Sequence, residues 1–250
     1  MDRSEKDWIF VSDAHLTGRE PEEVEVFLRF LNSEEGRMGH LVILGDLFEF
    51  LFGFRKAFPF PEYLPVLERL QQFNLQGIGI KYFEGNHDFF VGSLFSEKFG
   101  MNVEVHTEGW EGWLKEKRVF IAHGDLTDPE QWKYRIFRRL LKNQWTYSLI
   151  ELAGPHLSIQ VARRLGDRSY KKYHAPDRSA PPSTFKTFAH QKFLEGVEIV
   201  ILGHSHFPDR VEEQIDGRKY LYFNVGDWKT RRSFLRFSPP DHFELTRFSG

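Results

Sequence analysis

Five apolar runs in this 250-residue chain each end in aspartate, asparagine or histidine. With their polar ends, the runs are Trp8–His15, Leu41–Asp46, Ile80–Asp88, Val119–Asp125 and Val197–His206. A short apolar run is typical of a buried strand. Burial does not explain the polar ends, because removing an unpaired carboxylate from water is costly. Since open α/β sheets form their sites at the carboxyl ends of strands, the recurrence predicts one polar site assembled from five strand ends.

Helical patterns separate the first three of these strands. Residues Pro21–Leu31 carry one apolar stripe, and Pro61–Phe73 carry a second. The resulting β-α-β-α-β order predicts parallel strands joined by crossover helices. Further strands are expected in the second half of the fold, at Val103–Val105, Trp113–Leu114 and Val119–Ala122, and Phe234–Phe248 are expected to form the final strands of the sandwich.

Composition limits the class of protein. The chain is 40% hydrophobic and contains 26 Phe, which is enough for one large core, so we expect a single domain over residues 1–250. The Phe-rich segment Phe48–Phe60 either covers that core or forms a wall of an apolar ligand groove. A net charge of −2 gives no reason to expect nucleic-acid binding. The absence of cysteine excludes disulfides and thiolate catalysis and suits a reducing cytoplasm.

Membrane insertion is not expected from the sequence. The chain has no apolar window long enough to span a bilayer. Its first residues, Met1–Asp7, are too charged to begin a signal peptide. We therefore expect a soluble or peripheral protein.

A basic, mostly helical segment at about residues 129–174 interrupts the strand pattern between the strands that end at His123 and His204. It holds ten basic and only three acidic residues. The basic residues are Lys133, Arg135, Arg138, Arg139, Lys142, Arg163, Arg164, Arg168, Lys171 and Lys172. One interpretation is an ordinary solvated helical hairpin. The other is an amphipathic lid over the predicted site that contacts an anionic membrane face or a phosphorylated lipid, and the position of the segment favours it.

The five polar ends together resemble the signature of calcineurin-like metallophosphoesterases. The matching motifs are Asp13-x-His15, Gly45-Asp46, Gly85-Asn86-His87-Asp88, His123 and Gly203-His204-x-His206. The resemblance implies an α/β fold, a two-sheet β-sandwich flanked by helices, here with a helical lid insertion.

It also implies a pair of divalent metal ions. In the family pattern Asp46 bridges the two ions, Asp13, His15 and His206 complete one site, and Asn86, His123 and His204 complete the other. A bridging hydroxide would attack phosphorus. Oxygen and imidazole ligands without thiolate favour Mn²⁺.

Neighbouring residues narrow the resemblance to one branch of the family. Asp13–Leu16, Gly45–Glu49 and Asn86–Phe89 resemble UDP-2,3-diacylglucosamine pyrophosphatases of lipid A biosynthesis. This implies cleavage of the pyrophosphate bond to UMP and 2,3-diacylglucosamine 1-phosphate, by a cytoplasmic enzyme peripheral on the inner face of the membrane. One departure is His87, where the best-known members carry Arg. It favours an alternative, another dinuclear-metal phosphoesterase acting on a nucleotide or small phosphodiester; a third possibility is a non-catalytic interaction module that kept the fold.

Catalytic and substrate-binding roles follow from the same motifs. His87, oriented by Asp88, would stabilise charge or protonate the leaving phosphate. Asn86 and Asp128 are the expected substrate contacts. Asp128 also precedes Pro129 as a helix N-cap would, and a supporting role is equally open for Asp125. The late motif Asn224–Trp228 is either substrate-facing or structural.

Overall fold

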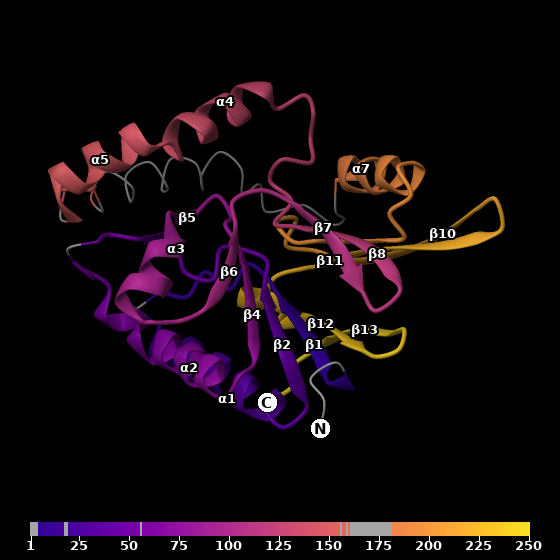
Figure 1. Ribbon diagram of the computed structural model, residues 1–250, viewed down its shortest axis with the longest axis horizontal. Helices are drawn as coiled ribbons and strands as arrows, with labels where there is room; N and C mark the ends of the chain where they lie inside the picture. The colour runs from indigo at the N-terminus through magenta and orange to yellow at the C-terminus, as the bar shows by residue number, and fades with distance from the viewer. Residues whose placement is uncertain (1–4, 18–19, 56, 156, 159, 161–181) are drawn as a thin grey trace.

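Two β-sheets face each other in the computed structural model, which describes residues 5–17, 20–55, 57–155, 157–158, 160 and 182–250 (Figure 1). The first sheet has six strands in the order β13-β12-β1-β2-β4-β6. They span, in that order, His242–Arg247, Ser233–Ser238, Asp7–Val11, Met38–Ile43, Gly79–Phe83 and Val103–His106. Strands β1, β2, β4 and β6 are parallel, as the sequence predicts for the first three, and β12 pairs antiparallel with β1.

The placement of β6 differs from the expectation. The sequence assigned Val103–Val105 to the second half of the fold, but β6 pairs with β4 at the edge of the first sheet. A short strand that does not lead into one of the five motifs gives no signal for the sheet that it joins. The final strands β12 and β13 also return to this first sheet, beside β1.

The second sheet has five strands in the order β10-β11-β9-β8-β7. They span, in that order, Pro208–Ile215, Arg218–Val225, Ile199–Leu202, Lys117–Ala122 and Trp110–Leu114. Alternating residues of β1 show how the sheets pack, because Phe10 lies in a core cluster with Ile121 and Ile201 of the second sheet, whereas Ile9 and Val11 lie in a different cluster. This is the period of two that a strand buried on both faces requires.

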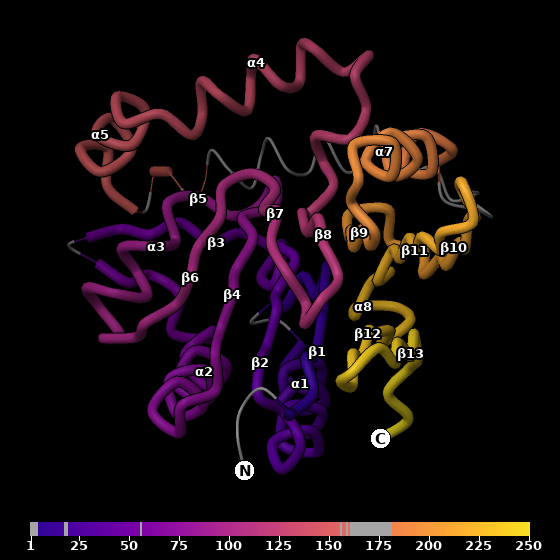
Figure 2. Tube along the Cα trace, turned by 45° about the vertical axis from the view of Figure 1, so that its right-hand side comes forward, coloured from indigo at the N-terminus to yellow at the C-terminus, as the bar shows by residue number. Residues whose placement is uncertain are grey.

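Helices cover the outer faces of the two sheets (Figures 1 and 2). Helix α1 (Pro21–Glu34) and helix α2 (Leu64–Leu75), which follows the 3₁₀ turn η2 (Pro61–Tyr63), bury Phe27, Phe30 and Leu67 in the cluster that contains Ile9. Helix α7 (Ser183–Leu194) packs Phe185 and Phe193 against the outer face of the second sheet. The layers are therefore helix, sheet, sheet and helix, which confirms the expected fold class.

Short elements close the sandwich at the end where β1, β2, β4, β8 and β9 finish. Strand β3 (Leu51–Phe52) pairs in parallel with β5 (Asp88–Phe89), and α3 (Val91–Ser93) and the π-helical turn η3 (Leu94–Lys98) follow. Several rings of the segment Phe48–Phe60 are buried in the core: Phe48, Phe52, Phe54 and Phe60. The segment thus covers the core, as one of its two interpretations proposed.

Helices α4 (Trp132–Leu141) and α5 (Gln144–Ala153) lie across this same end (Figures 1 and 2). We call these two helices the cap. The rest of the basic segment falls largely outside the described residues, including Arg163, Arg164, Arg168, Lys171 and Lys172.

A short helix, α8 (Trp228–Arg231), joins β11 to β12. Within the described ranges, no helix combines the length and apolar character needed to cross a bilayer.

Candidate metal centre

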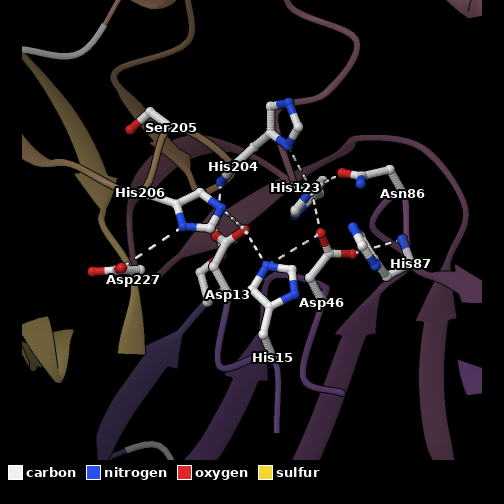
Figure 3. A network of polar contacts seen from close by, with 12 residues as sticks. Asp13, His15, Asp46, Asn86, His87, His123, His204, Ser205, His206 and Asp227 are labelled. Atoms are coloured by element: carbon white, nitrogen blue, oxygen red, sulfur yellow. Dashed lines mark hydrogen bonds and ion pairs between the residues drawn. The ribbon is translucent and has the colours of Figure 1, made fainter. Parts of the chain in front are cut away.

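The seven side chains predicted as metal ligands converge at one end of the sandwich (Figure 3). Those from the first sheet are Asp13 and His15 after β1, Asp46 after β2 and Asn86 after β4. Those from the second sheet are His123 after β8 and His204 and His206 after β9. Three groups among the described residues place ligand atoms within 4.8 Å of one another: Asp13–Asp46–His123–His204, Asp13–His15–His206 and His15–Asp46–His87.

Asp13, His15 and His206 form one half of the centre. The Oδ1 atom of Asp13 lies 3.4 Å from Nε2 of His206 and 3.9 Å from Nε2 of His15. That same nitrogen of His15 lies 3.9 Å from Oδ2 of Asp46. One carboxylate oxygen of Asp46 therefore faces both halves, because it also lies 3.5 Å from Nε2 of His123.

The other half is centred on His123. Its Nε2 atom lies 3.0 Å from Nδ1 of His204 and 3.2 Å from the amide oxygen of Asn86. Its other ring nitrogen, Nδ1, lies 2.6 Å from the carbonyl oxygen of Leu44. That backbone contact fixes the ring, so that Nε2 points toward Asp46.

Two buried atoms show that this donor set fits divalent metal ions. Asp13 is fully buried and His15 is 8% exposed, yet Asp13 Oδ1 and His15 Nε2 have no hydrogen-bond partner among the described residues. Buried polar atoms are normally paired, because leaving one unpaired costs about 1–3 kcal/mol. The two atoms face each other across a space bounded by carboxylates and imidazoles, which are ligands that suit Mn²⁺, Zn²⁺ or Fe²⁺.

The backbone at these residues is strained. Positive φ angles occur at Asp13 (51°), His15 (43°), Asp46 (52°), His204 (63°) and His206 (62°). Left-handed conformations of residues other than glycine cost roughly 1–3 kcal/mol each and concentrate at functional sites. At the neighbouring Gly85, an added Cβ would lie 2.1 Å from Oδ1 of Asp46, so this position leaves no room for a side chain.

Asp88 supports Asp46 rather than His87. The Oδ2 atom of Asp88 accepts hydrogen bonds from the backbone N–H groups of Asp46 (2.7 Å) and Gly85 (3.0 Å), and its Oδ1 accepts one from the Tyr82 hydroxyl (2.9 Å). The expectation was that Asp88 orients His87. In the structure, the contact to Nδ1 of His87 is made at 2.6 Å by the carbonyl oxygen of Glu49.

Two carboxylates that the sequence left without a chemical role contact ligand histidines. Glu49 Oε2 lies 3.4 Å from Nδ1 of His15, and Asp227 Oδ2 lies 3.7 Å from Nδ1 of His206. Such contacts on the outer nitrogen of a ligand histidine orient its ring. Both residues lie in motifs visible in the sequence, Gly45–Glu49 and Asn224–Trp228, but only the folded turns show where their carboxylates point.

Charges within the cluster shift several pKa values. Burial alone would raise the pKa of Asp46, but the surrounding histidines, led by His123, hold it well below its usual range. Burial and the neighbouring His123 lower the pKa of His204 to about 4. Burial would lower the pKa of His206, but the carboxylates of Asp13 and Asp227 outweigh it and raise this pKa to about 9.

Asp125 and Asp128 lie beside the centre, after His123. Asp125 is 6% exposed and pairs with Nε of Arg138 at 2.7 Å. Asp128 accepts hydrogen bonds from the backbone N–H of Glu130 and from the side chain of Gln131, so it caps the turn before α4, whose first residue is Trp132. Asp125, Asp128 and His204 all line one cavity of about 180 Å³.

A second cavity, of about 300 Å³, is lined by residues of the cap and of the segments around Glu84 and Phe90. Its lining includes Arg55, Glu84, Phe90, Lys142 and Tyr147. The volume is at the lower end of the range for small-molecule sites.

Comparisons with known proteins give the same family that the motifs of the site resemble. The family model described as calcineurin-like phosphoesterase matches residues 9–208. The chain is 28% identical over 247 residues to the UDP-2,3-diacylglucosamine hydrolase of Proteus mirabilis, covering 96% of this chain and 98% of that protein. It is 29% identical over 239 residues to the protein of the same name from Stenotrophomonas maltophilia, covering 91% and 93%. A Salmonella arizonae protein of that name is 28% identical over 240 residues, covering 96% and 98%.

Proposed function

Because this chain belongs to the calcineurin-like phosphoesterase family, we propose that it hydrolyses the pyrophosphate bond of UDP-2,3-diacylglucosamine. The products are UMP and 2,3-diacylglucosamine 1-phosphate. The observation that carries the substrate is the alignment with hydrolases of that name over nearly the whole of both chains. The converging donor set supports the reaction type, since the family implies divalent metals.

Seven residues hold two divalent ions in this proposal. Asp13, His15 and His206 would hold one, Asn86, His123 and His204 would hold the other, and Asp46 would serve both. Mn²⁺ is the proposed metal, because the donors are oxygen and imidazole. When bound, such a pair neutralises phosphate charge and lowers the pKa of water so that it attacks at neutral pH.

The remaining polar residues act on the substrate. His87 faces the centre from the same turn as Asn86, and its raised pKa, which the carboxylate of Asp46 maintains against burial, favours the cationic form. A cationic imidazole stabilises charge on the phosphates and can donate a proton to the leaving phosphate. Asp88 keeps the Asp46 backbone in place. Asn86 and Asp128 contact the substrate, Asp128 from the cavity that includes His204.

The cap binds the lipid surface in this proposal. Seven of its large apolar side chains are more than half exposed: Trp132, Ile136, Phe137, Leu140, Trp145, Leu149 and Leu152. Exposed cations accompany them at Lys133, Arg135 and Arg139. Apolar and basic side chains together are the composition of a helix that lies in an anionic membrane interface. We therefore regard residues 1–250 as one domain with a lid at about 129–174, peripheral on the inner face of the cytoplasmic membrane.

The test is an assay of the purified protein with Mn²⁺ and UDP-2,3-diacylglucosamine, with UMP release as the readout. We expect release by the wild type and none by His123→Ala, which loses one ligand. Equal release by the two proteins would overturn the proposal.

A second candidate function is favoured by one residue, His87, which stands where the best-known lipid A enzymes carry Arg. It is hydrolysis of a nucleotide or a small phosphodiester at the same centre. Faster turnover of such diesters than of the glycolipid would support it.

A further inference from the structure

The turn that carries Asn86 and His87 is closed by a buried carboxylate. Glu84 directly follows β4, and its side chain is 2% exposed. Its Oε1 accepts a hydrogen bond of 2.9 Å from the backbone N–H of Val91, at the far end of the turn. Glu84 begins the turn, and its carboxylate binds Val91 at the other end. The position of that carboxylate therefore sets the position of Asn86 and His87.

The partner of this carboxylate comes from the cap. Lys142, directly after α4, is 7% exposed at its side chain. Its Nζ donates to Oε2 of Glu84 at 3.1 Å and to the carbonyl oxygen of Gly85 at 2.9 Å. The ring centroid of Phe89 lies 5.5 Å from the same nitrogen. Lys142 therefore contacts three residues of the turn, although it directly follows a helix that lies outside the sandwich.

A second cation of α4, one helical turn earlier, contacts the neighbouring loop. Arg138 Nε pairs with Asp125 at 2.7 Å, and its Nη2 donates to the carbonyl oxygens of Glu84 (3.1 Å) and Thr107 (2.7 Å). Asp125 lies two residues after His123. Positions four apart lie on one helix face, so this face of α4 holds the ends of one strand from each sheet.

From these contacts we propose that Lys142 is a positioning residue for the metal centre, which makes the cap a working part of the hydrolase. It holds the Glu84–Val91 turn so that the amide of Asn86 and the imidazole of His87 stay aimed at the reacting phosphate. This inference rests on the proposed phosphoester hydrolysis at that centre, but not on the lipid nature of the substrate. Removing the cation leaves Glu84 as an unpaired buried charge, which would draw water or move the turn.

The experiment compares Lys142→Met, Lys142→Arg, Glu84→Gln and the double variant K142M/E84Q on bis(p-nitrophenyl) phosphate with saturating Mn²⁺. The matched control is Lys192→Met, because Lys192 is likewise a paired lysine, bound to Glu111 and Glu195, but on the second-sheet side. Thermal unfolding of each variant is measured to confirm folding.

We expect Lys142→Met to lower kcat by about 10- to 100-fold with little change in KM, the range seen when the support of a metal site is removed. Lys142→Arg recovers most of that loss, because it restores a buried cation with donors. The double variant loses no more than either single variant, since one interaction is removed in each case. Lys192→Met keeps the wild-type kcat.

Contrary results would be equally clear. The inference is overturned if folded Lys142→Met keeps its kcat, or if the losses of Lys142→Met and Glu84→Gln are additive. If Lys142→Met does not fold, the double variant decides, because it removes both buried charges together. Wild-type protein that cleaves the diester but releases no UMP from UDP-2,3-diacylglucosamine overturns the substrate alone, and the comparison at Lys142 still stands.

Discussion

The metal centre and the cap place their side chains in opposite ways. At the centre, Asp13, Asp46 and His123 are buried polar groups at the ends of core strands. In the cap, Trp145 is 85% exposed and Leu152 is 86% exposed, whereas the cation Arg138 is buried. The centre is thus held by the hydrophobic core, while polar ties to the strand ends contribute to holding the cap. A helix pair that turns Trp145 and Leu152 outward and buries Arg138 leaves an apolar surface for a partner to cover.

The largest effect is expected when the charge of Asp46, whose carboxylate faces both halves of the centre, is removed. Asp46→Asn keeps the shape of the side chain but removes the charge that faces both His15 and His123. We expect a loss in kcat of about 10³-fold, because metal charge stabilisation is worth several kcal/mol. Asp241→Asn, an exposed residue in the β12–β13 turn, is the control and keeps full activity. Comparable activity of the two variants would remove Asp46 from the ligand set.

A weaker effect is expected at Glu49, which contacts the imidazole of His15 on its outer nitrogen. Glu49→Gln removes the charge that lies 3.4 Å from Nδ1 of His15. We expect Mn²⁺ affinity or kcat to fall by about 10- to 100-fold, the usual range for such orienting carboxylates. Isothermal titration with Mn²⁺ measures it. An unchanged affinity and kcat would show that the strained backbone alone orients His15.

The pH dependence of metal binding distinguishes the centre from the cap again, because the centre contains histidines with shifted pKa values whereas α4 and α5 contain no histidine. His206 has a pKa of about 9 in the metal-free protein, so it is protonated at neutral pH and a metal ion must displace that proton. Mn²⁺ affinity should therefore fall by about tenfold for each pH unit below this pKa and level off above it. Titrations on both sides of this pKa measure the slope, and a flat profile contradicts the shift.

The smallest effect is expected in the cap. Leu152→Ser should weaken binding to vesicles that contain anionic phosphatidylglycerol by roughly fivefold, about 1 kcal/mol of lost apolar burial. Turnover of bis(p-nitrophenyl) phosphate should not change. Leu75→Ser is a matched control, because Leu75 is 80% exposed on α2, away from the cap. Equal vesicle binding by the two variants would show that the exposed apolar face of the cap does not contact lipid.

Much of the metal centre could be predicted from the sequence, because it is made of strand ends. A buried strand is visible as an apolar run. The residue that follows it lies at the carboxyl end of the sheet, whichever strands are its neighbours. This is why Asp13, Asp46 and His123 were placed together without knowledge of the strand order. The strand order itself was harder, and the edge strand β6 was assigned to the wrong half.

The supporting contacts could not be predicted, because they depend on where side chains turn. Asp88 follows His87 in sequence, yet its carboxylate faces the Asp46 backbone, and a carbonyl of Glu49 reaches the imidazole instead. Lys142 and Arg138 are two of the ten basic residues of the helical segment, and neither interpretation of that segment predicts that they are buried. Both point inward, because buried carboxylates at the strand ends provide partners that periodicity does not reveal.

The division of ligands between the two sheets has a consequence for how the protein matures. Asp13, His15, Asp46 and Asn86 belong to the first sheet, whereas His123, His204 and His206 belong to the second. A nascent chain that has emerged only as far as β6 already carries every oxygen donor but only one of the four imidazoles. High-affinity loading must then wait until residue 206 has been synthesised and the ligand-carrying strands of the two sheets have docked, so that a bound ion reports that docking.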